Sequence, residues 1–162
     1  LGVHAPNDPA LVEAALAALG AGGEELLEDA PLRAVLSARR DIARPFDRTL
    51  DLLAAAATDA RQARALRALA DGDDGAEPDG ADLLDLLHAF PSARPPLAAL
   101  VASLPVLKPR LYSIASSPLA CPGRVELCVS VVREARRGRE RDGVASCHLG
   151  FRADPAVPLR AE

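Results

Sequence analysis

Apolar residues recur at helical spacing near the start of the chain. Leu11, Ala15 and Leu19 lie four positions apart, between Asp8-Pro9 and Gly20. This spacing gathers apolar side chains on one face of a helix. Asp and Pro are common at helix starts, and Gly is common just past helix ends. The pattern therefore predicts a helix that begins near Asp8-Pro9 and ends at Gly20.

The same spacing returns in several Ala- and Leu-rich segments. They predict helices over residues 31–39, 47–57, 59–70 and 83–90, and a last one that opens at Pro95-Pro96 and runs to about Ser103. The segment 41–45 separates the helix predicted over 31–39 from the next one, since Pro45 disfavours helical backbone at Arg44. The acidic, Gly-rich segment 71–80 predicts a loop.

After Pro105 the apolar pattern alternates instead. Val125, Leu127, Val129 and Val131 occupy every second position, which predicts a strand over residues 123–133. Residues 108–116 also have strand character. The predicted fold class is therefore α+β.

Both ends of the chain and the basic run 133–141 predict further extended structure. We expect Leu1-Gly2-Val3 to be the end of a strand already under way, and residues 157–162 to be the start of another. Glu134 and Glu140 are mixed into the basic run, so we expect a solvated hairpin tip there, with a surface for an anion or a partner as the alternative.

Composition narrows the class of protein. The 162 residues are 49% hydrophobic and 26% charged, with a net charge of −4, which is typical of a globular protein and disfavours a nucleic-acid binder. Cys121, Cys128 and Cys147 have no disulfide or zinc spacing, so we expect no metal site and a reducing, cytoplasmic setting. No apolar run approaches the about 20 residues of a membrane span, and we expect no signal peptide and no membrane partner.

Two places have side chains suited to an anionic cofactor. Arg110 can make paired hydrogen bonds to a phosphate, Tyr112 can cover a flat ring, and Ser113 adds a hydroxyl beside them. In Gly143-Val144-Ala145-Ser146, small residues let a phosphate approach the backbone, and a helix that starts there would offer free N–H groups. Taken alone, these residues are better explained by an ordinary strand with a charged and an aromatic face and by a plain turn.

A family resemblance joins the two places. Residues 105–118, which contain Arg110-Leu111-Tyr112-Ser113, resemble the FAD-binding signature of the diflavin NADPH-dependent reductases. Residues 129–133 resemble the strand beside the cofactor, and Gly143-Val144-Ala145-Ser146 is similar to the family's segment at the pyrophosphate. Landmarks at residues 2–9, 41–45 and 90–96 extend the resemblance over nearly the whole chain, with the bacterial sulfite reductase flavoprotein type in particular.

The resemblance implies a role for each candidate residue. Arg110 would hold the FAD pyrophosphate, Tyr112 would stack on the isoalloxazine ring, and Ser113 would act catalytically beside the reactive flavin nitrogen. Leu111 would belong to the same site. Cys128, Val129 and Ser130 would contact the cofactor through their backbone, and residues 143–146 would cradle the phosphates (Gly143, Val144, Ala145 and Ser146).

The resemblance also implies the architecture and the partners. Residues 1–8 and 105–162 would form part of an antiparallel flavin-binding β-barrel, incomplete in its first and last strands, and residues 9–104 a helical connecting domain. Electrons would pass from NADPH via FAD to FMN and a haem or iron–sulfur acceptor protein, which implies an FMN domain and an NADPH-binding domain as partners. Glu134 stands where many relatives carry an aromatic residue. The alternative is a non-enzymatic helical interaction or spacer module with a degenerate flavin barrel.

Overall fold

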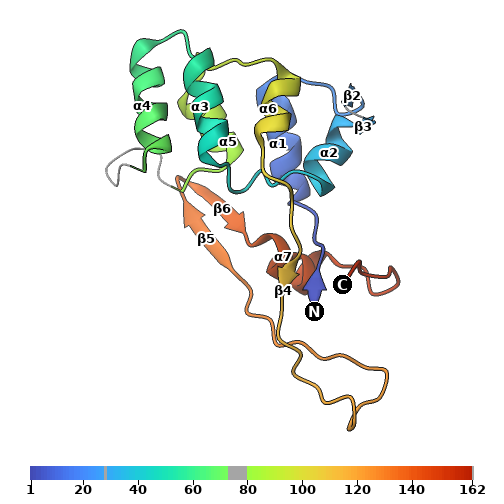
Figure 1. The fold of residues 1–162 in the computed structure, drawn as a ribbon. Helices are drawn as coiled ribbons and strands as arrows, with labels where there is room; N and C mark the ends of the chain where they lie inside the picture. The colour runs from blue at the N-terminus through green and yellow to red at the C-terminus, as the bar shows by residue number, and fades with distance from the viewer. Residues whose placement is uncertain (28, 73–79, 162) are drawn as a thin grey trace. The chain divides into compact units, whose positions relative to one another are not determined.

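The chain forms two compact units. A computed structural model describes residues 1–27, 29–72 and 80–161. One unit is Pro9–Leu107, and the other combines Leu1–Asp8 with Lys108–Glu162. The first unit is mainly helical, and the second contains short strands, long extended segments and one short helical stretch (Figure 1).

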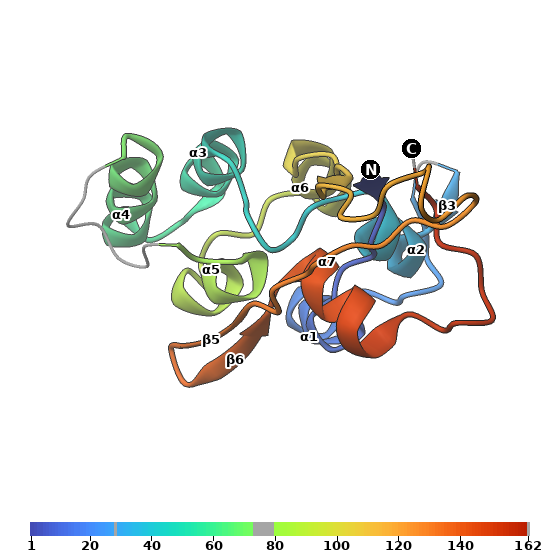
Figure 2. The ribbon, with the colours of Figure 1, turned by 90° about the horizontal axis from the view of Figure 1, so that it is seen from below.

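Six helices make up most of the described residues of the first unit. They are α1 (Pro9–Leu19), α2 (Leu32–Ala38), α3 (Asp47–Ala56), α4 (Ala60–Ala70), α5 (Leu83–Ala89) and α6 (Leu97–Ser103). Within this unit, α3, α4 and α6 lie in one row and α1 and α5 in a second (Figure 2). The predicted helices are all confirmed to within about two residues at each end, and Gly20 ends α1 with a positive φ of 64°.

The apolar stripes of these helices meet in one core. Its largest members, all almost fully buried, are Leu32, Leu36, Ile42, Leu53, Leu66, Leu83, Leu86 and Leu100. Each such side chain stabilises the fold by about 1.5–3 kcal/mol relative to an exposed one. A buried polar link also joins α3 to α6, because Thr49 Oγ1 donates to the Ser103 carbonyl at 2.9 Å.

A small hairpin that the apolar pattern does not predict precedes α2. Its strands are β2 (Leu26–Leu27) and β3 (Ala30–Pro31), which pair antiparallel. Most of the predicted loop 71–80 lies outside the described residues, which resume at Gly80. In the described ranges, no helix has both the length and the apolar character needed to cross a membrane.

The described residues of the second unit form four short strands followed by a helical turn. Its strands are β1 (Gly2–Val3), β4 (Arg110–Leu111), β5 (Arg133–Arg136) and β6 (Arg139–Asp142), followed by α7 (Val144–Cys147) and the π-helical turn η1 (His148–Arg152). β1 pairs antiparallel with β4, and β5 with β6. The α+β class is confirmed, while the described residues form two-stranded sheets and no closed barrel.

The strand prediction for residues 123–133 is wrong over most of its length. There, Leu127 forms an isolated bridge with Ile114, and β5 starts only at Arg133. The strand predicted over 108–116 likewise shortens to β4 and that bridge. A strand is stable only where its backbone N–H and carbonyl groups pair with a neighbouring strand. Among the described residues, this segment forms a bridge only at Leu127 before β5 begins, and the exposed side chains of Val125 and Val131 have no second layer over them. The alternating pattern thus marks extended chain without fixing its pairing.

The structure of the basic hairpin and of the two ends of the chain agrees better with the predictions. Arg137 and Gly138 both have positive φ, 52° and 72°, as a tight two-residue turn between β5 and β6 requires. The whole turn is exposed, which confirms the solvated hairpin tip. The strand predicted at the first residues is present as β1, which contains Gly2 and Val3. Of the strand predicted over 157–162, the described residues form only an antiparallel bridge between Ala161 and Val3.

Candidate functional site

The segment with Arg110 and Tyr112 is anchored by the first residues of the chain. β4 pairs with β1 in the register Gly2 opposite Leu111. The Tyr112 N–H donates to the Leu1 carbonyl at 2.9 Å, and the Leu1 amino group donates to the Tyr112 carbonyl at 3.0 Å. Alternation along a strand puts Arg110 and Tyr112 on the same face. Both are half-buried, whereas Leu111 on the opposite face is 83% exposed.

Ser113 and Cys128 lie in two segments that run side by side. Ile114 forms an antiparallel bridge with Leu127, and the Ala115 N–H donates to the Glu126 carbonyl at 2.8 Å. The next positions in this register are Ser113 and Cys128, both exposed. Val129 is half-buried and Ser130 is exposed. Ser113 and the segment 128–130 are therefore presented on neighbouring stretches of extended chain.

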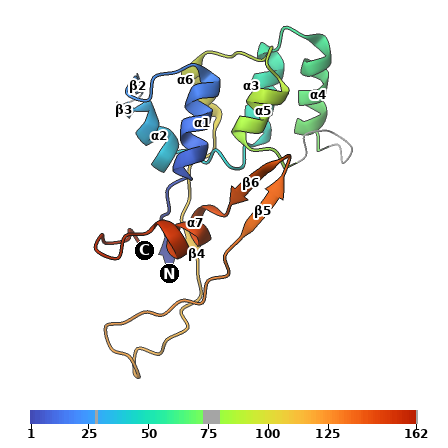
Figure 3. The same ribbon diagram turned by 180° about the vertical axis from the view of Figure 1, so that it is seen from behind.

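Residues 143–146 are fixed to Val132. The Gly143 N–H donates to the Val132 carbonyl at 2.9 Å, and the Ser146 hydroxyl accepts the Val132 N–H at 3.1 Å. The Cys147 thiol donates to the same Val132 carbonyl at 3.2 Å. The hairpin of β5 and β6 thus leads straight into α7 (Figure 3).

Gly143 is required by this packing. A Cβ at this position would lie 2.6 Å from Ser146 Oγ and 3.0 Å from Val132 Cβ, closer than atoms can approach without displacement. Ser146 is buried, and its hydroxyl fastens the segment to its neighbour. The groups best suited to an anion are therefore the N–H groups of Val144, Ala145 and Ser146, since first-turn amides have no acceptor within the helix.

Arg152 is a residue of this site that the sequence pattern does not mark. Its guanidinium donates to the Val144 carbonyl at 3.2 Å and forms an ion pair with Asp8 at 3.1 Å. It therefore links the first turn of α7 to the N-terminal segment. Next to it, burial and then the charge of Arg152 lower the pKa of His148 from its ordinary value.

Arg133 forms a second unexpected contact. Its Nε forms an ion pair with Asp142 at 3.1 Å, and its guanidinium carbon lies 4.6 Å from the centroid of the Phe151 ring. A hydrogen bond with the Cys147 side chain, and then the charge of Asp142, raise the pKa of Arg133 above its ordinary value. In the sequence, Arg133 is the first residue of a basic run and the last residue of the segment 129–133 that resembles the strand beside the cofactor, and neither pattern predicts its contact with Phe151.

The candidate residues form separate local groups. Tyr112 is tied to Leu1, Ile114 to Leu127, and residues 143–147 to Val132. Among the described residues, no hydrogen bond or ion pair joins Tyr112 or Ser113 to residues 143–146. The structure therefore supplies the Arg110 guanidinium, the Tyr112 ring and the first-turn amides of residues 144–146, groups that suit a flavin dinucleotide.

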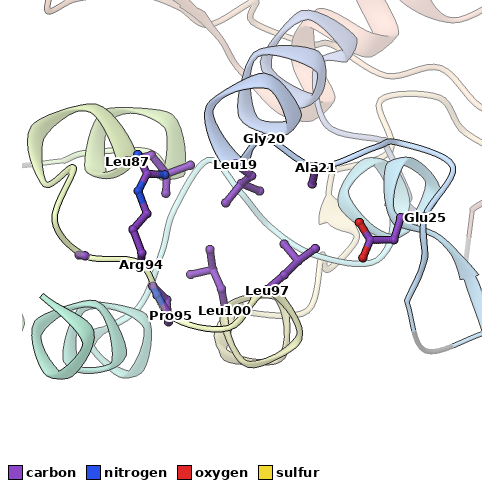
Figure 4. A pocket seen from close by; sticks show the side chains of 10 residues that line it. Leu19, Gly20, Ala21, Glu25, Leu87, Arg94, Pro95, Leu97 and Leu100 are labelled. Carbon is purple, nitrogen blue, oxygen red and sulfur yellow. The ribbon is translucent and has the colours of Figure 1, made fainter.

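A pocket in the helical unit lies apart from these residues in sequence. It has a volume of about 180 Å³, and Leu19, Leu97 and Leu100 point toward one another across it (Figure 4). Arg94 at its edge already donates to the carbonyls of Pro91 and Ala18. Ligand pockets usually measure about 300–1,000 Å³, so this one is too small for a dinucleotide.

Comparison with known proteins decides the family. The family described as the FAD binding domain matches residues 1–148. The chain belongs to the FAD binding domain family. The predicted resemblance to the diflavin reductases is thereby confirmed, and FAD, the cofactor predicted for this chain, is the one that the family's description names.

Individual relatives of this FAD binding domain agree with that assignment. The sulfite reductase (NADPH) flavoprotein alpha-component of Bacillus subtilis (strain 168) is 34% identical over 98% of this chain and 27% of its own length. NADPH oxidoreductase A of Dictyostelium discoideum is 50% identical over 43% of this chain and 11% of its own length. Nitric oxide synthase of Drosophila melanogaster is 49% identical over 44% of this chain and 6% of its own length. The chain thus spans about a quarter of these relatives' length or less.

Proposed function

We propose that this chain is the FAD-binding and connecting region of an NADPH-dependent diflavin reductase of the sulfite reductase flavoprotein type. The observation that carries the proposal is the family match over residues 1–148. In the whole enzyme, electrons pass from NADPH via FAD to FMN and on to a haem or iron–sulfur acceptor protein. The partners of this region are an FMN domain and an NADPH-binding domain, on the same or a separate chain.

Arg110, Tyr112 and Ser113 form the flavin side of the proposed site. The Arg110 guanidinium binds the pyrophosphate, because it can make two charge-assisted hydrogen bonds to it. Tyr112 covers the isoalloxazine ring, supported by its half-buried position on the same strand face as Arg110. Ser113 places its exposed hydroxyl beside the reactive flavin nitrogen, and Leu111 completes this strand of the site.

Two further segments bind the rest of the cofactor. The backbone of Cys128, Val129 and Ser130 runs along it. Residues 143–146 cradle the phosphates through the amides of Val144, Ala145 and Ser146, with Gly143 allowing the segment to pack on Val132. FAD supplies the hydride and single-electron chemistry. The task of the protein residues is to bind and orient it.

The two units have different tasks in this proposal. Residues 1–8 and 105–162 contribute strands to an antiparallel, ferredoxin reductase-like flavin barrel, and residues 9–104 are the connecting domain. In such a barrel the side chains of Val125 and Val131, which are exposed in the extended segment, would be covered by a second layer.

Flavin binding tests the proposal directly. Titration of the chain with FAD is expected to change flavin fluorescence and shift the visible spectrum. Arg110→Ala should weaken FAD binding about ten- to a hundredfold, since hydrogen bonds to charged groups contribute about 1.5–3 kcal/mol. Arg64→Ala is the matched control, because Arg64 is exposed on α4 in the other unit.

Three outcomes separate this proposal from its alternative. Tight FAD binding that Arg110→Ala weakens and Arg64→Ala preserves supports the reductase. Equal effects of the two substitutions contradict the assigned role of Arg110. Absence of FAD binding contradicts the proposal and favours a helical interaction module with a degenerate barrel.

A further inference from the structure

An exposed aromatic ring and a guanidinium face each other beside the proposed phosphate segment. Phe151 is 63% exposed, and the Arg133 guanidinium carbon lies 4.6 Å from the centroid of its ring. A guanidinium held over the face of an aromatic ring is attracted by the negative charge of that face. This pair therefore offers a flat surface on which another planar group can stack.

The pair is held in place from several sides. Asp142 forms an ion pair with Arg133 Nε at 3.1 Å, and the strand that carries Arg133, β5, pairs along its length with β6. On the other side, a Cβ at Gly150 would lie 3.3 Å from Val131 Cγ2, so the turn carrying Phe151 packs closely on the chain before β5. Both side chains therefore have contacts that limit their motion before any ligand arrives, which reduces the entropy lost on binding.

The position of the pair suits one half of FAD. Arg133 directly follows Val132, which holds residues 143–147. If those residues bind the phosphates, the adenosine attached to the phosphates must lie close by. In the sequence of this unit, Tyr112 and Phe151 are the residues of Phe, Tyr or Trp type. FAD has two ring systems, and Tyr112 is already assigned to one of them.

We propose that Phe151 and Arg133 form the platform on which the adenine of FAD stacks, and that this platform selects FAD over FMN. The inference rests on the proposed function and adds a specificity determinant to it. Adenine is a planar heteroaromatic ring that stacks on aromatic side chains and on guanidinium planes. FMN has the isoalloxazine ring and one phosphate but no adenine, so the platform contributes nothing to its binding.

Comparing FAD with FMN tests this platform. Dissociation constants of the chain for both flavins are measured by fluorescence titration. Phe151→Ala is expected to raise the dissociation constant for FAD about tenfold, which corresponds to the loss of one base-stacking contact. The dissociation constant for FMN should change less than about twofold. Phe151→Tyr keeps a ring and should keep FAD affinity. Arg133→Lys keeps the positive charge but removes the planar guanidinium, so it should weaken the binding of FAD and leave the binding of FMN unchanged.

The outcomes distinguish this inference from the proposed function. If the unchanged chain binds neither flavin, the proposed function fails and the platform with it. If it binds FAD but Phe151→Ala weakens both flavins equally, or weakens neither, the platform is wrong while the flavin site stands. Circular dichroism shows whether each variant is folded. If a variant unfolds, the test is instead whether ADP competes with FAD for binding to the unchanged chain. ADP carries the adenine and phosphates alone, so failure to compete overturns the platform.

Discussion

At the scale of single residues, the close packing of Ser146 and Val132 leaves no room for a side chain at position 143, where the chain has Gly143. A Cβ there would lie 2.6 Å from Ser146 Oγ, and this oxygen accepts the Val132 N–H. If Ser146 turned away, it would leave that donor without its acceptor. We predict that Gly143→Ala lowers the free energy of unfolding by about 1–3 kcal/mol and weakens FAD binding. Urea unfolding and flavin titration measure the two effects.

Gly22 provides the matched control for this substitution. It lies in the helical unit, and a Cβ there would meet nothing within 4 Å. Gly22→Ala should leave both the free energy of unfolding and FAD affinity close to those of the unchanged chain. An unaffected Gly143→Ala variant would show that Ser146 and Val132 can move apart without cost, contrary to the packing described.

The sequence predicts some residues of the site and misses others for a physical reason. Arg110 and Tyr112 lie two positions apart, so local spacing alone puts them on one strand face. Arg152 contacts Asp8, and Arg133 contacts Phe151, across long stretches of sequence. Such pairs depend on the tertiary fold, and no local pattern of charges reveals them.

At the scale of elements, helices were predictable and strand pairing was not. A helix such as α4 satisfies its own backbone hydrogen bonds, and its cap Asp59 lies next to it in sequence, accepting from the N–H groups of Arg61 and Gln62. A strand depends on a partner that the segment itself does not contain. The alternating valines between 123 and 133 therefore predicted extended chain correctly, and a continuous ladder wrongly.

The capping box of α5 gives a prediction at this scale. The Asp82 side chain accepts the Asp85 N–H at 2.9 Å, the Asp85 side chain accepts the Asp82 N–H at 3.1 Å, and both residues are buried. We predict that Asp82→Ala lowers the free energy of unfolding of the helical unit by about 1–2 kcal/mol. Urea unfolding followed by circular dichroism at a helix-sensitive wavelength measures the change.

Asp59, the cap of α4, is the comparison for Asp82. It is exposed, so water replaces much of the lost hydrogen bonding when it is substituted. Asp59→Ala should therefore destabilise the unit less than Asp82→Ala. A larger effect at Asp59 would mean that burial does not strengthen the cap at α5.

At the scale of the whole molecule, the two units have unequal cores. The main apolar cluster lies entirely within Pro9–Leu107. In the other unit, described residues such as Leu119, at 93% exposed, and Val125, at 51%, leave apolar surface in contact with solvent. Since burial of apolar area is the dominant stabilising contribution, the helical unit has the higher intrinsic stability.

This inequality predicts how FAD acts on the chain. Amide hydrogen exchange without FAD should be slow in the helices of Pro9–Leu107 and fast in the other unit. FAD at about 100 times its dissociation constant stabilises the bound state by about 2.7 kcal/mol, so amides near Tyr112, Val132 and residues 143–147 should exchange up to about a hundredfold more slowly. The helical unit should change little, and Arg110→Ala should reduce the protection. Protection by FAD that appears mainly in α1 to α6 would instead place the cofactor on the helical unit and contradict the assignment of the site.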